Sequence, residues 1–263
     1  MAAVVSETDG VVLETRDHGE SDLIVTFYCP DSGKITAIAK GARKSRRRFV
    51  NKLEMFTYLR LQLRRSGNRS LLLLEEAELH AAFLNLRFDI VRYSVASVIR
   101  ELMLLGTREG ETDEQLYKML LWTLDSLDRR DTPLRPLLFF FLRYLDYIGY
   151  RPEMDCCTQC GTSAPSAGQF RFNIFSGGLI CTSCSPAPSS SLIPLSPTTI
   201  THLSDAQDIS LKQLSGLQMQ TRSIHEGLNI LHRYGRHILQ REIHSWKMLR
   251  QMFAKSSNTI KEG

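Results

Sequence analysis

Short apolar segments alternate with turn residues along the first eighty positions, a pattern typical of β-strands. Strands are predicted at 4–16 (as one strand or a short hairpin), 23–29, 34–39, 55–63 and 70–79. Five short strands with one long connection between the third and the fourth favour a small Greek-key barrel of the OB type. An SH3-like barrel and a simple meander are the alternatives.

From residue 81 the apolar positions recur every three or four residues, which indicates amphipathic helices. Helices are predicted over 81–106 (one or two), 112–130 and 137–147, then over 196–203, 210–214 and 217–253. The 137–147 segment is apolar nearly all round, so we expect it to be buried. The last helix carries four histidines without the four-residue spacing that aims two rings at one metal ion, so solvent or capping roles are predicted for them. They are His225, His232, His237 and His244.

Positive charge is concentrated between residues 34 and 69, where twelve Lys or Arg residues face a single acid, Glu54. Six of these cations fall within residues 40–48, in a flexible loop predicted between two strands. Their mutual repulsion favours a polyanionic partner such as a phosphate backbone. The alternative is a solvated charge run that only improves solubility. The candidate nucleic-acid-binding residues are Lys34, Lys40, Arg43, Lys44, Arg46, Arg47, Arg48, Arg60, Arg64, Arg65 and Arg69.

Aromatic residues are sparse near this loop. Phe49, Phe56 and Tyr58 are the nearest candidates for stacking on bases. The composition therefore favours sequence-independent binding of the backbone over the reading of bases.

Two C-x2-C pairs, Cys157/Cys160 and Cys181/Cys184, are separated by twenty residues. Two thiolates on each tight turn can converge on one ion, so the pattern predicts a zinc site with four sulfur ligands. With no position left for water or substrate, the zinc would be structural. Four thiols without metal are the alternative, and Cys156 could replace Cys157 as a ligand. Cys29 is predicted to be a buried, small apolar residue.

These elements predict an α+β multidomain protein. Its parts are an OB-type barrel at 1–80, an all-α helical domain at 81–150 and 186–255, an inserted four-cysteine zinc module at 151–185 and a polar tail at 256–263. Residues 185–197 are rich in Ser and Pro and are interpreted as a linker or a surface crossing.

Nothing in the sequence asks for catalysis. The motifs G-x-x-x-x-G-K-[ST], G-x-G-x-x-G, G-x-S-x-G and H-E-x-x-H are all absent. Asp17, Glu20 and Asp22 suggest the Mg²⁺ ligands of a nuclease, but their spacing matches no known site. We therefore predict a protein that is not an enzyme. Without a signal pattern or an apolar run of about 20 residues, we also expect a cytoplasmic location and no membrane contact.

The order of these parts resembles the RecO family of bacterial DNA-repair proteins over nearly the whole chain. The resemblance is carried by E-S-D-L-I at 20–24, D-S-G at 31–33, K-G-A-R at 40–43, the cysteine module, L-H-R-Y at 231–234 and S-W-K-M-L at 245–249. It implies an ATP-independent recombination mediator of the RecF pathway, associated with the nucleoid. Such a protein binds single- and double-stranded DNA, anneals complementary strands and acts with RecR to load RecA onto strands coated by the single-strand-binding protein SSB. Because all four cysteines are kept, the zinc-containing form is implied.

The resemblance also implies a site for the SSB C-terminal tail, which is acidic and ends in an apolar residue. Its predicted receptor is the set of cations that flank the apolar helix, Arg129, Arg130, Arg135 and Arg143, with Arg233 and Arg236 as the alternative. Two other classes stay open: a zinc-ribbon transcription or translation factor that binds nucleic acid or polymerase, and a nuclease subunit.

Overall fold

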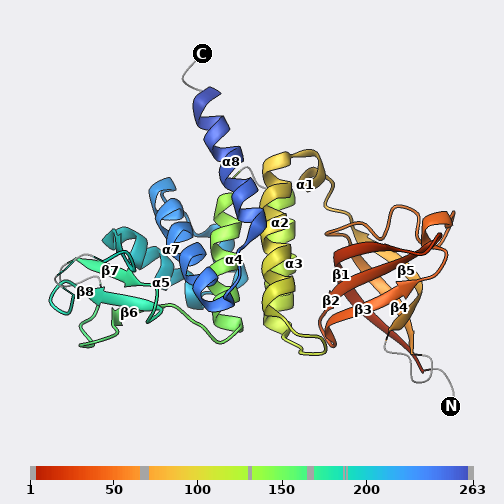
Figure 1. Ribbon diagram of the computed structural model, residues 1–263, viewed down its shortest axis with the longest axis horizontal. Helices are drawn as coiled ribbons and strands as arrows, with labels where there is room; N and C mark the ends of the chain where they lie inside the picture. Colours follow the sequence, from red (N-terminus) through yellow and green to blue (C-terminus); the bar gives the residue numbers. More distant parts are fainter. Residues whose placement is uncertain are drawn as a thin grey trace. The chain divides into compact units, whose positions relative to one another are not determined.

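The computed structural model describes residues 4–65, 71–129, 132–164, 169–185, 187 and 189–259. The chain divides into two compact units, Met1–Arg129 and Arg130–Gly263 (Figure 1). The division falls within the region predicted as one helical domain, so three of its helices belong to the same unit as the barrel. Within the described residues, no helix is both long and apolar enough to cross a bilayer.

Five strands close into a barrel in the first unit. They are β1 (Val4–His18), β2 (Asp22–Cys29), β3 (Gly33–Ala39), β4 (Tyr58–Arg65) and β5 (Leu72–Ala81). The strand order is β1-β2-β3-β5-β4, with β3 and β5 parallel. A meander would pair β3 with β4, so the OB-type prediction is confirmed. Residues 4–16 lie in one strand, which a bulge between Val12 and Glu14 allows to bend.

The basic loop between β3 and β4 is docked on the barrel, and the prediction that it is flexible is wrong. Three of its apolar side chains, Phe49, Leu53 and Phe56, are only 4%, 5% and 2% exposed. Phe49 and Leu53 join the apolar cluster of the barrel interior. Lys52 Nζ donates to the Ala77 carbonyl of β5 at 2.7 Å. The loop therefore covers the barrel core and presents its cations from a fixed support.

Three helices complete the first unit: α1 (Leu84–Phe88), α2 (Ile90–Gly106) and α3 (Glu114–Arg129). Arg87 donates to the Thr57 hydroxyl at 2.6 Å, at the end of the basic loop. Lys34 of β3 donates to the carbonyls of Leu104 and Thr107, at the C-terminal end of α2 where a cation is favoured. Burial lowers the pKa of Lys34. Arg87 and Lys34 therefore join the helices to the barrel.

The second unit contains α4 (Leu134–Tyr147), α5 (Pro197–Asp208), α6 (Leu211–Gly216), α7 (Thr221–Leu239) and α8 (His244–Thr259). Helix α4 is buried as predicted, with Phe141 fully inside. Helix α7 approaches it closely, since a Cβ on Gly235 would lie 2.6 Å from the Phe141 ring.

The prediction of one helix over 217–253 is wrong. Gln240 adopts a left-handed conformation (φ 50°) that ends α7, and α8 begins four residues later. The break lets Trp246 stack on His232, with ring centroids 4.3 Å apart, and buries Leu249. A straight helix would leave this apolar area in water, so its burial favours the turn.

A four-stranded sheet is formed by β6 (Glu153–Cys157), β7 (Phe170–Asn173), β8 (Gly178–Cys181) and β9 (Leu192–Leu195). The order is β6-β8-β7-β9. Strand β9 lies within the segment predicted as a linker or surface crossing and pairs with β7, so the linker interpretation is wrong for these residues. Ile193 and Leu195 alternate into the buried face, which explains why the segment is ordered.

The Glu226 carboxylate of α7 holds the start of α5. It accepts hydrogen bonds from Ser196 Oγ at 2.8 Å, Thr199 Oγ1 at 2.7 Å and Arg222 Nε at 2.7 Å. Burial alone would raise the pKa of Glu226, but these donors outweigh it and lower the pKa to about 2.

We expect Glu226→Gln to lower the free energy of unfolding by about 1–2 kcal/mol at pH 7, because hydrogen bonds to the charged carboxylate are lost. The folded-state pKa lies below the ordinary value, so this stabilisation is present above about pH 4.5 and is lost as the pH falls toward 2. Urea unfolding of the wild-type protein and of Glu226→Gln at pH 7 and pH 3 measures this difference in the free energy of unfolding. A difference that stays the same at both pH values would contradict this role.

Candidate metal centre and nucleic-acid interface

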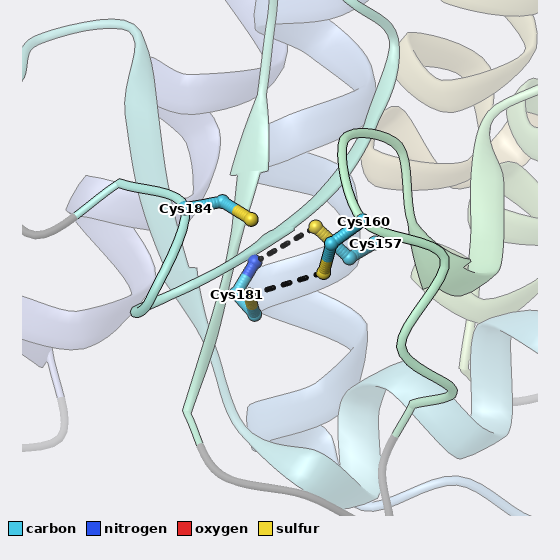
Figure 2. A group of neighbouring side chains, drawn as sticks. All are labelled: Cys157, Cys160, Cys181 and Cys184. Carbon is cyan, nitrogen blue, oxygen red and sulfur yellow. Dashed lines mark hydrogen bonds between the residues drawn. The ribbon is translucent and has the colours of Figure 1, made fainter.

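The four predicted cysteine ligands converge at one point of the second unit. The sulfur atoms of Cys157, Cys160, Cys181 and Cys184 all lie within 4.8 Å of one another. Figure 2 shows them directed toward a common centre from two turns of the backbone. The Sγ atoms of Cys160 and Cys181 are 3.7 Å apart. Tetrahedral sulfur ligands at about 2.3 Å from zinc are separated by about 3.8 Å, so the cluster fits such an ion.

The two turns follow β6 and β8, which are neighbours in the sheet. After Cys160 the chain reverses at Gly161, whose φ of 73° favours glycine. Its amide donates to the Cys157 carbonyl at 2.9 Å, and the Cys181 amide donates to the Cys157 sulfur at 3.4 Å. The local backbone thus directs N–H groups at sulfur, an arrangement that stabilises thiolates.

The titration of these thiols follows the same geometry. Burial raises the pKa of Cys157, but the backbone amides of Cys181, Cys160 and Gln159 outweigh it and lower the pKa overall. Hydrogen bonds from the side chain and backbone of Thr162 lower the pKa of Cys160 to about 6. Interactions with the Cys160 and Cys181 sulfurs raise the pKa of Cys184 to about 12. The thiolate form is thus favoured at Cys157 and Cys160 and disfavoured at Cys184, and a bound cation would favour deprotonation of all four.

The structure distinguishes the two adjacent cysteines. Cys157 belongs to the cluster and is buried. Cys156 is outside the cluster, and its backbone forms an isolated antiparallel β-bridge with Ser163. Cys29 is fully buried in the barrel core, as expected of a small apolar residue, and burial raises its pKa to about 12.

The basic loop carries cations that the structure places in different environments. Gly41 has a left-handed φ of 67° and its amide donates to the Asp22 carboxylate at 2.8 Å, which fixes the turn into a short 3-10 helix (Ala42–Lys44). Arg43 lies 3.5 Å from Asp17. Arg48 donates to the carbonyls of Lys40 and Glu75, and its guanidinium lies over the Phe49 ring. Three loop cations are exposed and have no acidic partner within the described residues: Lys44, Arg46 and Arg47. Lys40 is exposed as well, but its charge acts on the Asp22 carboxylate. Arg65, at the end of β4, is exposed and also lacks an acidic partner in the described ranges.

Three other candidates are engaged elsewhere. Arg60 lies between Glu7 at 3.1 Å and Asp9 at 3.4 Å, and Arg64 Nε lies 2.7 Å from a Glu75 oxygen. Lys34 is the α2 anchor described above. These three cations therefore have partners within the first unit, in contrast to Lys44, Arg46 and Arg47 of the loop. Arg69 lies outside the described residues.

The acids suggested as nuclease ligands do not form a metal site. Asp22 accepts from Gly41, which lowers its pKa, and Asp17 pairs with Arg43. Across the described ranges, the four cysteines are the one group of at least three ligand side chains close enough to hold an ion.

Two family models match the chain. "Recombination protein O N terminal" matches residues 1–83 and "Recombination protein O C terminal" matches residues 87–247. The chain belongs to the RecO family. A DNA repair protein RecO from Syntrophus aciditrophicus is 36% identical over 244 residues, covering 92% of this chain and 94% of the relative. RecO from Anaeromyxobacter dehalogenans (strain 2CP-C) is 33% identical, covering 91% and 94%. These names favour DNA repair over the transcription or translation factor.

Three of the arginines predicted to receive the SSB tail already have partners within the protein. Arg143 is buried and donates to the carbonyls of Ala206 (at 3.0 Å) and Ile209, and Arg135 donates to the Leu217 carbonyl at 3.2 Å. Arg129 pairs with Asp125 at 2.8 Å. Arg130 lies outside the described residues.

Sequence reasoning missed a groove between α7 and α8. A cavity of about 320 Å³ is lined by Leu228, Trp246 and Leu249, and it adjoins one of about 510 Å³ bordered by Arg236, Lys247 and Arg250. His232 lies between them against Trp246, so a solvent role for it is wrong. Burial, then Arg236 and Arg250, lower its pKa to about 4. The S-W-K-M-L motif contains Trp246 and Leu249 and was the only hint of this groove in the sequence analysis. The α7 side of the groove could not be inferred from it, because it depends on the break between α7 and α8.

Proposed function

We propose that this RecO-family DNA-repair protein is a recombination mediator that binds single- and double-stranded DNA and anneals complementary strands in the cytoplasm, at the nucleoid. The observation that carries the proposal is the basic loop, in which Lys44, Arg46 and Arg47 are exposed and have no acidic partner within the described residues. Through RecR, and without a reaction of its own, it would help to load RecA onto strands coated with SSB. These finer roles rest on the family.

The loop is suited to annealing because it offers charge without stacking groups. Phe49 and Phe56 are buried in support of the loop, so its surface contacts phosphates and leaves bases free to pair. Annealing requires that repulsion between two strands be screened, and no covalent step is involved. The test is the annealing rate of complementary oligonucleotides without ATP, with cleavage assayed in parallel in the presence of Mg²⁺. Cleavage, or a rate equal to that without protein, would reject the proposal.

We further propose that the ion at the four cysteines is a structural Zn²⁺. The sulfur-only donor set, the tetrahedral spacing and the lowered pKa of Cys157 and Cys160 support it. The chain's own residues hold the module to α7, because Phe172 packs edge to face on Tyr234 at 5.5 Å.

We propose the groove between α7 and α8 as the binding site of the SSB tail, in place of the arginines that flank α4. An acidic peptide with an apolar end needs an oily pocket beside cations, and the pocket formed by Trp246 and Leu249 next to Lys247 and Arg250 supplies both. Lys247 and Arg250 are exposed and have no acidic partner within the described residues.

We expect the double variant Lys247→Glu/Arg250→Glu to weaken binding of an SSB tail peptide by at least about tenfold, because like charges would face the acidic peptide. Fluorescence anisotropy of a labelled peptide measures this. Arg129→Glu, an exposed position on α3, is the control and should leave the affinity within about twofold. If Arg129→Glu weakens binding and the double variant does not, the contact lies at the arginines that flank α4.

A further inference from the structure

The hairpin between β7 and β8 presents an aromatic ring to solvent. Phe175 is 70% exposed in the turn between these strands. The turn is fixed, because the Phe175 amide donates to Asn173 Oδ1 and the Gly177 amide donates to the Asn173 carbonyl, both at 2.9 Å. Exposing so large an apolar group on a fixed turn forfeits the free energy that burial would give. The ring is therefore accessible to a ligand.

Helix α7 supports this ring from behind. Phe175 meets His237 with ring centroids 5.2 Å apart and an interplanar angle of 77°. Next to it, the turn packs against α7 so closely that a Cβ on Gly177 would lie 2.3 Å from the Tyr234 hydroxyl. The ring is therefore a preorganised surface and loses little freedom when a ligand binds.

The charge around this platform is positive. Arg233 lies one helical turn before His237 and donates to the Ser190 carbonyl at 2.6 Å, which leaves its charge uncompensated. Arg241 follows α7, is exposed and has no acidic partner in the described parts of the chain.

Residues 217–255 contain seven Lys or Arg against two acids, and both acids are occupied. Glu226 holds the start of α5, and Glu242 pairs with Arg236. Together with the charges of Arg233 and Arg241, this excess of cations favours an anionic ligand.

We propose that Phe175 is a stacking platform for an unpaired base of single-stranded nucleic acid, with the neighbouring arginines placed for its phosphates. Stacking on an aromatic face tolerates any base, whereas bases within a duplex are already stacked and paired. The platform would give a preference for single strands that the basic loop, with its buried aromatics, does not supply. This inference deepens the proposed function and rests on it.

The test uses Phe175→Leu and Phe175→Trp in the full chain, with affinity measured for an oligothymidylate and for a duplex of equal length. Leucine keeps an apolar side chain but has no π-face. We expect Phe175→Leu to bind the single strand about five- to tenfold more weakly. Its duplex affinity and the dependence of single-strand affinity on salt should be unchanged, because no charge is removed. Phe175→Trp should keep the single-strand affinity.

Phe88→Leu is the matched control. Phe88 is 88% exposed on α1, beside the cap residue Asp89 and away from any basic cluster in sequence, so its replacement should change neither affinity beyond about twofold. The inference is overturned if Phe175→Leu binds the single strand like wild type, if both affinities fall equally, or if the variant loses metal or thermal stability. Wild-type protein that binds neither DNA would instead reject the proposed function itself.

Discussion

Cys181→Ser is expected to yield protein that lacks metal and is largely insoluble or partly unfolded, whereas the wild-type chain should carry about one Zn²⁺. Cys181 is buried at the end of β8, which pairs with both β6 and β7 in the four-stranded sheet. Binding of structural zinc contributes on the order of 10–16 kcal/mol in small zinc domains, which is as much as the whole stability of a typical domain. The sheet should therefore not survive loss of the ion.

Cys156→Ser provides the control for this result. Cys156 is adjacent to a ligand but outside the cluster, so its variant should keep one metal ion per chain and a normal thermal transition. Metal is measured by mass spectrometry on protein purified without chelator, and folding by circular dichroism. Wild-type protein without zinc, or Cys181→Ser with full zinc and unchanged unfolding, would reject a structural zinc site.

The cysteine cluster was predictable because its information is local. Two C-x2-C turns need only be brought together by one short hairpin, and the alternation of Phe170 and Phe172 predicts that hairpin. The C-x2-C spacing also favoured Cys157 over Cys156, and the cluster contains Cys157, which pairs with Leu179 of β8.

The strands of the barrel could be predicted from the alternation of apolar residues. Whether a charged residue on a strand has a partner of opposite charge could not be predicted from the nearby sequence. Arg60 read as a free cation in the sequence, yet the register of β4 against β1 places it opposite Asp9 and the register against β5 places it opposite Glu78. Pairing between distant segments decides this compensation. By contrast, the docking of the loop had a signal, because Phe49, Leu53 and Phe56 repeat at intervals of four and three within the basic run.

The end of α7 had no such signal. The residues from 217 to 253 keep a helical period, and neither Gly nor Pro occurs at the break. The turn at Gln240 is favoured by tertiary packing of Trp246, which outweighs the local preference to continue. The groove that results was therefore invisible to sequence reasoning.

Replacing Lys44, Arg46 and Arg47 together with alanine is expected to weaken binding of single-stranded DNA by about a hundredfold at 0.1 M salt. Each lost phosphate contact lowers the slope of log affinity against log salt by about 0.7 for a single strand, so three contacts lower it by about 2. Duplex affinity and the annealing rate should fall as well, because the same charges serve all three. Thermal stability should change little, since these side chains are exposed and have no acidic partner within the described residues.

Arg48 is left in place because it donates to two backbone carbonyls and its loss would disturb the docked loop. Arg60→Ala is the matched control, since it removes one exposed arginine whose charge Glu7 and Asp9 already compensate. Its salt slope should match that of wild type. A solvated charge run predicts an unchanged slope for the triple variant, and that result would refute the role of the loop. Equal changes in slope per removed cation in both variants would instead show that DNA senses the overall charge of the barrel and that Lys44, Arg46 and Arg47 have no special part.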